Sequence, residues 1–171
     1  VHLPLQSGSS RILKAMRRTY DRDRYVALVD RLRSAIPDLA LGTDIIVGFP
    51  GETDEDFAAT LEVVEEVRYD SAFTFVYSPR AGTAAAGMDA QVPDEVKIAR
   101  MERLVEVVQR IAAERNAERV GRVEQVLVEG RSRTDERLLR GRTRRSTTVN
   151  FAGTAEPGEL VAGAPVGGRL D

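Results

Sequence analysis

Three short segments of the chain carry polar residues and glycines of the kinds that bind small molecules. They are Gln6-Ser-Gly8, the run from Asp44 into Gly48-Phe-Pro-Gly-Glu-Thr53, and Ser78–Thr83 with Arg80 at its centre. A glutamine amide offers both a hydrogen-bond donor and an acceptor, and glycine lets a ligand approach the backbone closely. Asp44 interrupts an apolar run, where a carboxylate has to be paired, hydrogen-bonded or at a ligand-lined strand mouth. The three segments therefore predict a cleft for a small polar ligand.

The same segments also allow explanations without a ligand. Gly48 and Pro50 suit a tight strand-to-helix turn that binds nothing. Asp44 can bond to a neighbouring backbone N–H or to an arginine, and Arg80 can be a simple surface charge. The segments contain no nucleophile–base pair and no carboxylate pair at catalytic spacing. The residues by themselves thus predict a binding cleft and no catalytic group.

The scarcity of metal ligands narrows the chemistry further. The chain of 171 residues has no cysteine and a single histidine, His2. These counts exclude disulfides, thiolate catalysis and a cysteine-held zinc or iron–sulfur centre within these residues, and no metal site is expected. No apolar run approaches the ~18 residues of a membrane span and no leader pattern is present, so we expect a cytoplasmic protein without a membrane partner.

The elements that must position the three segments alternate between strands and helices. Strands are predicted at residues 39–49 and 71–77, and residues 1–5 are typical of the end of another strand. Such alternation predicts a parallel sheet, and the carboxyl ends of parallel strands meet at one edge. The three segments each follow a predicted strand, so we expect them to line one cleft.

The helices between these strands have recognisable start signals. We expect N-caps at Ser9 or Ser10, at Asp21 and at Thr53, where Asp56 completes a capping box. A loop of small and polar residues is predicted at 78–91.

A second part of the chain is predicted to be all-β. A helix from Pro93 to about Asn116 leads into it, so the domains are expected at residues 1–115 and 116–171. Short strands predict a small β-barrel there; they lie at 123–128, 138–143, 147–151 and 159–161.

Charge separates the same two parts. Residues 1–115 carry a net charge of −4 and residues 116–171 one of +2, within a total of −2. Seven arginines lie within fifteen residues: Arg131, Arg133, Arg137, Arg140, Arg142, Arg144 and Arg145. This density is typical of a surface that binds RNA phosphates, and the alternative is a solvated hairpin. Phe151 is the one aromatic residue available there as a platform for bases.

Four ordered motifs resemble the radical S-adenosylmethionine (SAM) methylthiotransferases. They are His-Leu-Pro-Leu-Gln-Ser-Gly-Ser at 2–9, Leu-Lys-Ala-Met-Arg-Arg at 13–18, Thr-Asp-Ile-Ile-Val-Gly-Phe-Pro-Gly-Glu-Thr at 43–53 and Tyr-Ser-Pro-Arg-Ala-Gly-Thr at 77–83. The closest resemblance is to the MiaB type, which adds a methylthio group to isopentenyladenosine beside the tRNA anticodon. Residues from Gly141-Arg-Thr-Arg to Pro157-Gly-Glu-Leu resemble the TRAM RNA-binding module of this family, so the resemblance covers about residues 1–161.

This resemblance implies a fold and a set of cofactors. The fold would be α/β, with the last strands of a partial TIM-type radical SAM barrel followed by a small all-β, OB-like TRAM barrel. In such enzymes a [4Fe–4S] cluster on a Cys-x3-Cys-x2-Cys loop cleaves SAM, the resulting radical abstracts hydrogen from C2 of the adenine, and a second cluster takes part in sulfur insertion. Both cysteine sets precede Val1 by family order, so we expect a piece of a larger domain that is inactive alone.

The resemblance also assigns residues. Gln6, Arg18 and Asp44 match positions that contact SAM, and Gly48, Phe49 and Pro50 would border its adenine. The tRNA contacts are expected from Arg131, Arg133, Arg140, Arg142, Arg144 and Arg145.

Three alternatives remain open from the sequence. One is a methylthiotransferase that acts on a ribosomal protein, and another is one that acts on threonylcarbamoyladenosine in tRNA; Gln6-Ser-Gly8 and Thr43-Asp44 favour the isopentenyladenosine type over the ribosomal-protein enzyme. The third is a non-catalytic RNA-binding protein. Residues 162–171 depart from the family in being loop-like, so the second barrel is expected to lack its closing strand, or these residues are an artefact.

Overall fold

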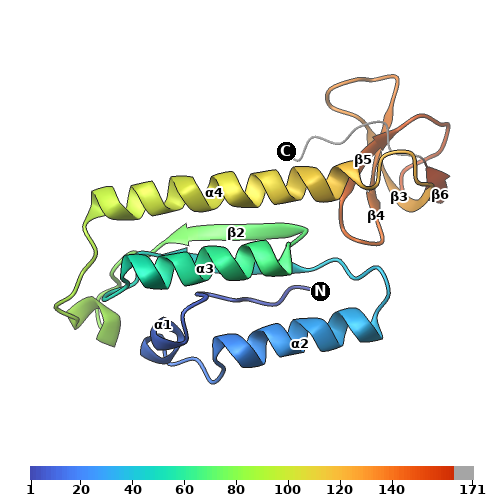
Figure 1. Ribbon diagram of the computed structural model, residues 1–171. Helices are drawn as coiled ribbons and strands as arrows, with labels where there is room; N and C mark the ends of the chain where they lie inside the picture. The colour runs from blue at the N-terminus through green and yellow to red at the C-terminus, as the bar shows by residue number, and fades with distance from the viewer. Residues whose placement is uncertain (164–171) are drawn as a thin grey trace. The chain divides into compact units, whose positions relative to one another are not determined.

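The computed structural model describes residues 1–163, and the chain divides into two compact units between Ala112 and Ala113 (Figure 1). The first unit contains a parallel sheet of strands β1 (Gly42–Val47) and β2 (Ser71–Val76), in register from Gly42 opposite Ser71 to Val47 opposite Val76. The parallel sheet predicted from the alternating pattern is therefore confirmed, with β1 shorter than the predicted 39–49.

The opening segment runs beside β1 without forming a regular strand. Isolated parallel bridges join His2 to Gly42 and Gln6 to Ile45. Between them Pro4 has no N–H to donate, and the Leu5 N–H donates to the Thr43 side chain, 2.9 Å away. The strand predicted at residues 1–5 is thus present only as an interrupted third row of the sheet.

The helices start where the capping residues predict. They are α1 (Ser10–Ala15), α2 (Arg22–Ala35), α3 (Asp54–Val67) and α4 (Asp94–Ala117). Ser9, Asp21 and Thr53 are confirmed as N-caps, and Thr53 with Asp56 forms the expected capping box. The loop predicted at 78–91 contains a short 3-10 helix, η1 (Ala84–Gly87), capped by Thr83.

The two faces of the first sheet have different surroundings. Ile45 and Val47 of β1 are fully buried and join one apolar core with residues of α2, α3 and α4, such as Val29, Val63 and Leu104. Side chains alternate along a strand, so their neighbours in β1 and β2 point the other way. That second face includes Phe73 and Phe75, which are 61% and 51% exposed. Ligand space therefore has to lie on the second face.

The second unit is an antiparallel sheet in the order β5-β4-β3-β6. Its strands are β3 (Glu124–Arg131), β4 (Leu139–Thr143), β5 (Thr148–Phe151) and β6 (Leu160–Gly163). Within residues 1–163 β5 and β6 pair only with their inner neighbours, so the described part of the predicted small β-barrel is an open four-stranded sheet. Ala162 and Gly163 belong to β6, which corrects the expectation of a loop there, and residues 164–171 lie outside the described part.

The core of this unit corrects a second expectation. Phe151 packs with Val126, Val128 and Leu139 and is 2% exposed. A buried ring cannot stack on a base, so Phe151 is a core residue and not a platform for RNA.

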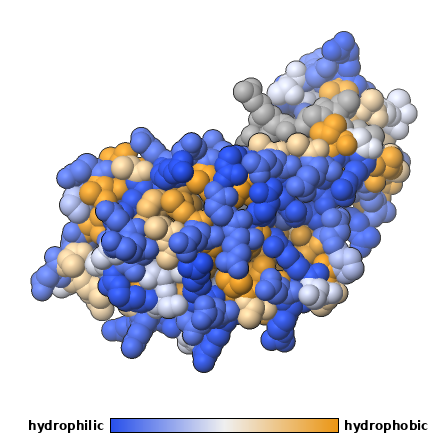
Figure 2. Space-filling view, viewed as in Figure 1, coloured by the Kyte–Doolittle hydropathy of each residue, from blue (hydrophilic) through white to orange (hydrophobic). Residues whose placement is uncertain are grey.

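None of the helices in the described part of the chain is long and apolar enough to cross a membrane. The face drawn in Figure 2 is mainly hydrophilic, and its hydrophobic side chains gather in separate patches.

Candidate functional site

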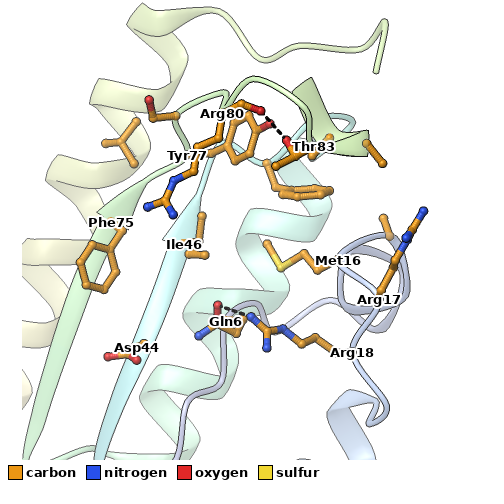
Figure 3. Close-up of a pocket in the computed structure, with 16 residues that line it drawn as sticks. Gln6, Met16, Arg17, Arg18, Asp44, Ile46, Phe75, Tyr77, Arg80 and Thr83 are labelled. Atoms are coloured by element: carbon orange, nitrogen blue, oxygen red, sulfur yellow. Dashed lines mark hydrogen bonds between the residues drawn. The ribbon is translucent and has the colours of Figure 1, made fainter. Parts of the chain in front are cut away.

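A cleft of about 600 Å³ opens on the second face of the first sheet (Figure 3). All three predicted segments contribute to it, through Gln6, Phe49 and the loop that carries Arg80. The other lining residues come from the end of α1 and from the two strands, and they include Met16, Arg17, Arg18, Asp44, Ile46, Phe75 and Tyr77. The structure therefore brings Gln6, Arg18 and Asp44 to one place, although they are far apart in the sequence.

Gln6 occupies a strained position that the sheet holds in place. Its φ is +67°, in the region that favours glycine, and the residue is 7% exposed. Its N–H donates to the Asp44 carbonyl and its own carbonyl accepts from the Ile46 N–H, at 2.8 and 2.9 Å. Such strain costs on the order of 1–3 kcal/mol and persists only where the surroundings fix it.

Arg18 fixes the direction of the Gln6 side chain. The Arg18 Nη2 atom donates to Gln6 Oε1 over 2.9 Å, and Figure 3 shows the guanidinium directed toward the amide. Because a guanidinium group can only donate hydrogen bonds, the Gln6 atom that it contacts must be the amide oxygen and not the amide nitrogen. The amide nitrogen of Gln6 is therefore the atom left to donate to a ligand in the cleft.

Asp44 is paired, as a carboxylate in an apolar run has to be. Its Oδ1 atom lies 3.1 Å from His2 Nε2, and its side chain is 27% exposed. The partner is neither the arginine nor the backbone N–H that the sequence suggested. His2 thus holds one oxygen of the Asp44 carboxylate, and the Asp44 side chain still borders the cleft.

The segment from Gly48 to Pro50 contributes to the cleft through one residue. Phe49 lines it and packs edge-on against Tyr77, with ring centroids 5.3 Å apart. Gly48 and Pro50 are buried and are not among the lining residues in the described part. At Gly48, where φ is +73°, an added Cβ would lie 2.4 Å from Lys97 Cγ, so this glycine lets α4 pack closely.

Gly8 also has a packing role that the sequence did not indicate. A Cβ there would lie 2.3 Å from the Ala59 carbonyl oxygen of α3. This glycine therefore clears space for a helix and not for a ligand.

A buried ion pair supports the turn that carries Phe49. Glu52 Oε1 accepts from the Gly48 N–H at 2.9 Å and from Arg100 Nη1 at 2.7 Å. Burial raises the pKa of Glu52, and the Gly48 N–H and Arg100 partly offset that rise. Sequence reasoning missed Arg100, because its partners lie in a different element of the chain.

A second arginine holds the same turn from α1. Arg11 donates to the Gly51 carbonyl over 2.6 Å and pairs with Asp56. Although burial acts to raise the pKa of Asp56, hydrogen bonds from Arg11, Ser9 and Thr53 bring it down to about 2. The capping box of α3 is therefore also part of the support of the cleft.

Sequence reasoning also missed the floor of the cleft. Ile46 lines it opposite Phe75, its partner in the sheet register. The signal was present in the period-two spacing of Phe73, Phe75 and Tyr77, which puts three aromatic residues on one face of β2 and its continuation.

The seven arginines between Arg131 and Arg145 fall into three groups. Arg140 and Arg142 lie on β4 and both pair with Glu129, at 3.6 and 3.0 Å. Arg131, at the end of β3, and Arg133 and Arg137, in the loop that follows, form the second group. Arg144 and Arg145 follow β4 in a turn. The arginine-dense segment is thus a strand with a loop on each side and not one uniform patch.

Comparison with known proteins agrees with the division of the chain into two units. Residues 1–64 match the model of the radical SAM superfamily, and residues 117–162 match that of the TRAM domain. The chain is 56% identical over 162 residues to a tRNA-2-methylthio-N(6)-dimethylallyladenosine synthase of Clostridium botulinum. It is 57% identical to the protein of the same name from Clostridium perfringens.

The match extends over 94% of this chain but over 36% of each of those relatives. The chain therefore spans about a third of the length of the curated relatives it matches. The order of the two matched regions is that of the two structural units: a region similar to the radical SAM superfamily is followed by one similar to the TRAM domain.

Proposed function

We propose that this chain supplies part of the SAM-binding cleft and the RNA-binding module of a cytoplasmic enzyme that adds a methylthio group to C2 of N6-isopentenyladenosine in tRNA. The observation that carries the proposal is the convergence of Gln6, Arg18, Asp44 and Phe49 at one cleft in a chain with both matched regions. The names of the relatives favour isopentenyladenosine over the other two methylthiotransferase substrates.

The cleft fits SAM in size and chemistry. Its volume of about 600 Å³ lies within the range of small-molecule sites, roughly 300–1,000 Å³. The Gln6 amide nitrogen offers a donor, and Asp44 offers an acceptor for hydroxyl or ammonium groups. Phe49 gives an apolar surface for the adenine. In this proposal Gly48 and Pro50 shape the turn that carries Phe49. They do not border the adenine directly, in contrast to what the resemblance implied.

The iron–sulfur clusters have no ligands in this chain. With no cysteine in 171 residues, the residues present do not fit a [4Fe–4S] cluster. The role we assign to the chain is therefore to bind and orient SAM and to hold tRNA through the arginines of the second unit.

A chimaeric enzyme tests this role. The 162-residue segment of the Clostridium botulinum relative that matches this chain is replaced by the corresponding residues of the chain. The chimaera is expressed in cells that lack the modification, and tRNA nucleosides are measured by mass spectrometry. We expect 2-methylthio-N6-isopentenyladenosine to appear and threonylcarbamoyladenosine to stay unmodified.

Two variants of the chimaera and one control variant give the test its specificity. Gln6→Ala and Asp44→Asn should abolish or strongly reduce the product, whereas Glu95→Gln, at an exposed position in the first turn of α4, should not. A folded chimaera that binds tRNA but forms no methylthio product would contradict the proposed activity.

A further inference from the structure

A row of four side chains crosses the outward face of the second unit's sheet. Arg142 of β4 stands opposite Thr148 of β5 on one side and Leu127 of β3 on the other, and Leu127 stands opposite Leu160 of β6. Directly opposite residues of antiparallel strands share a face. Leu127 and Leu160 are 42% and 62% exposed, so this face is turned away from the core.

The two leucines form an apolar strip beside positive charge. A single exposed leucine needs no explanation, but these two are paired across neighbouring strands and continue directly into Arg142. The Arg142 side chain is 46% exposed, and Arg140 lies on the same face two residues earlier. Arg144, which follows the strand, is exposed and its guanidinium has no ion-pair partner within residues 1–163.

We propose that this face binds unpaired RNA, with bases on Leu127 and Leu160 and backbone phosphate on Arg142. The inference rests on the proposed RNA-binding function and adds to it the surface and the kind of RNA. A row of two leucines, one arginine and one threonine offers both an apolar surface and a cation, and it matches a single strand, whose bases and phosphates are both accessible. A duplex stacks its bases and leaves only its groove edges and backbone to be contacted.

The loop arginines are a weaker site for the same ligand. Arg137 forms an ion pair with Asp135 at 2.9 Å, and Arg131 donates to the Glu136 carbonyl at 3.3 Å. Just as Glu129 pairs with Arg142 on the sheet, the loop between β3 and β4 carries its own counter-charge. It also lacks an apolar strip, so it can attract phosphate but cannot distinguish a single strand from a duplex.

Binding of two RNA probes to the full 171-residue chain tests the inference. The probes are a fluorescent oligouridine and a blunt RNA duplex of equal length, each titrated at several salt concentrations. The variant Leu127→Thr with Leu160→Thr removes the apolar strip and keeps residues that favour strands. Ile98→Thr is the control, since Ile98 is 56% exposed but lies on α4.

We expect the double threonine variant to bind oligouridine roughly fivefold more weakly or worse at every salt concentration, with an unchanged salt slope. Its affinity for the duplex, and the affinity of the Ile98 variant for both probes, should stay as in the parent chain. Arg142→Gln should instead flatten the oligouridine slope by about 0.7, the value for one phosphate contact of a single strand.

Three results would overturn the inference. The first is an unchanged oligouridine affinity in the double threonine variant. If the sedimentation of that variant also changes, the leucines mediate contact between copies of the chain. The second is an equal loss for both probes. The third is a dependence on Arg131 and Arg133 alone, which leaves RNA binding intact as a function but assigns it to the loop. If the parent chain binds neither these probes nor tRNA, the RNA part of the proposed function fails as well.

Discussion

Glu52 and Arg100 form one buried ion pair, with 2.7 Å between Glu52 Oε1 and Arg100 Nη1. Their side chains are 1% and 7% exposed, and they come from the turn after β1 and from α4. The same Glu52 oxygen accepts the Gly48 N–H. Through this one atom, α4 fixes the turn that brings Phe49 into the cleft.

Removal of Arg100 should therefore destabilise the first unit strongly. We expect Arg100→Met to cost on the order of 3 kcal/mol in urea unfolding at neutral pH, because it leaves the Glu52 carboxylate buried without its cation. Adding Glu52→Gln should recover part of that loss, since the amide still accepts the Gly48 N–H and carries no charge. Equal losses in the single and double variants would contradict a coupled pair.

An alanine at Gly48 and one at Gly8 should both clash with a neighbour, but only the clash at Gly48 should be relieved by shortening a side chain. Gly48→Ala places a Cβ against the Lys97 side chain at a φ of +73°, and Gly8→Ala places one against the backbone of α3. We expect both to destabilise by more than about 1 kcal/mol. Adding Lys97→Ala should recover part of the loss for Gly48 and nothing for Gly8, as thermal unfolding of the four variants would show.

Acid should weaken the first unit through Asp56. Its pKa is about 2 when folded, below the ordinary value of 3.8, so the ionised form stabilises the fold. The stabilisation is fully present above pH 4 and is lost as the pH falls toward 2; it amounts to at most about 2 kcal/mol. Unfolding free energies measured across this range should fall less steeply in Asp56→Asn. Identical slopes in both proteins would contradict the role of this carboxylate.

Removal of Glu129 should strengthen RNA binding. Glu129 pairs with both Arg140 and Arg142 and neutralises part of their charge. We expect Glu129→Gln to bind oligouridine several-fold more tightly and with a steeper salt slope. Glu136→Gln, at an exposed position of the β3–β4 loop, is the control for net charge. If both variants tighten binding equally, the effect is one of overall charge and not of the two freed arginines.

The local elements and the three loops of the cleft were predictable from the residues alone. The capping residues Ser9, Asp21 and Thr53 act on N–H groups within three residues of themselves, so their patterns predict helix starts directly. The parallel sheet follows from the alternation of strands and helices. The cleft where Gln6, Asp44 and Phe49 meet lies on one face of that sheet, because Asp44 is inside β1 and not beyond its carboxyl end.

Which side chains meet across elements could be learned only from the folded chain. Nothing near Asp44 in the sequence indicates His2 as its partner, and nothing near Glu52 indicates Arg100. The same holds for Gly48, whose neighbour Lys97 comes from α4. The first contact depends on pairing of the opening segment with β1, and the other two depend on packing of α4; a local pattern encodes neither.

The second unit shows the same limit in its strands. The period-two pattern located β3 to β6 but could not decide whether the sheet closes, because closure depends on strand tilt and register and not on alternation. It also left open on which face each residue lies. Register alone buries Phe151 in the core and aligns Arg142, Leu127 and Leu160 in one row on the outward face, since a shift by one residue would exchange the two faces.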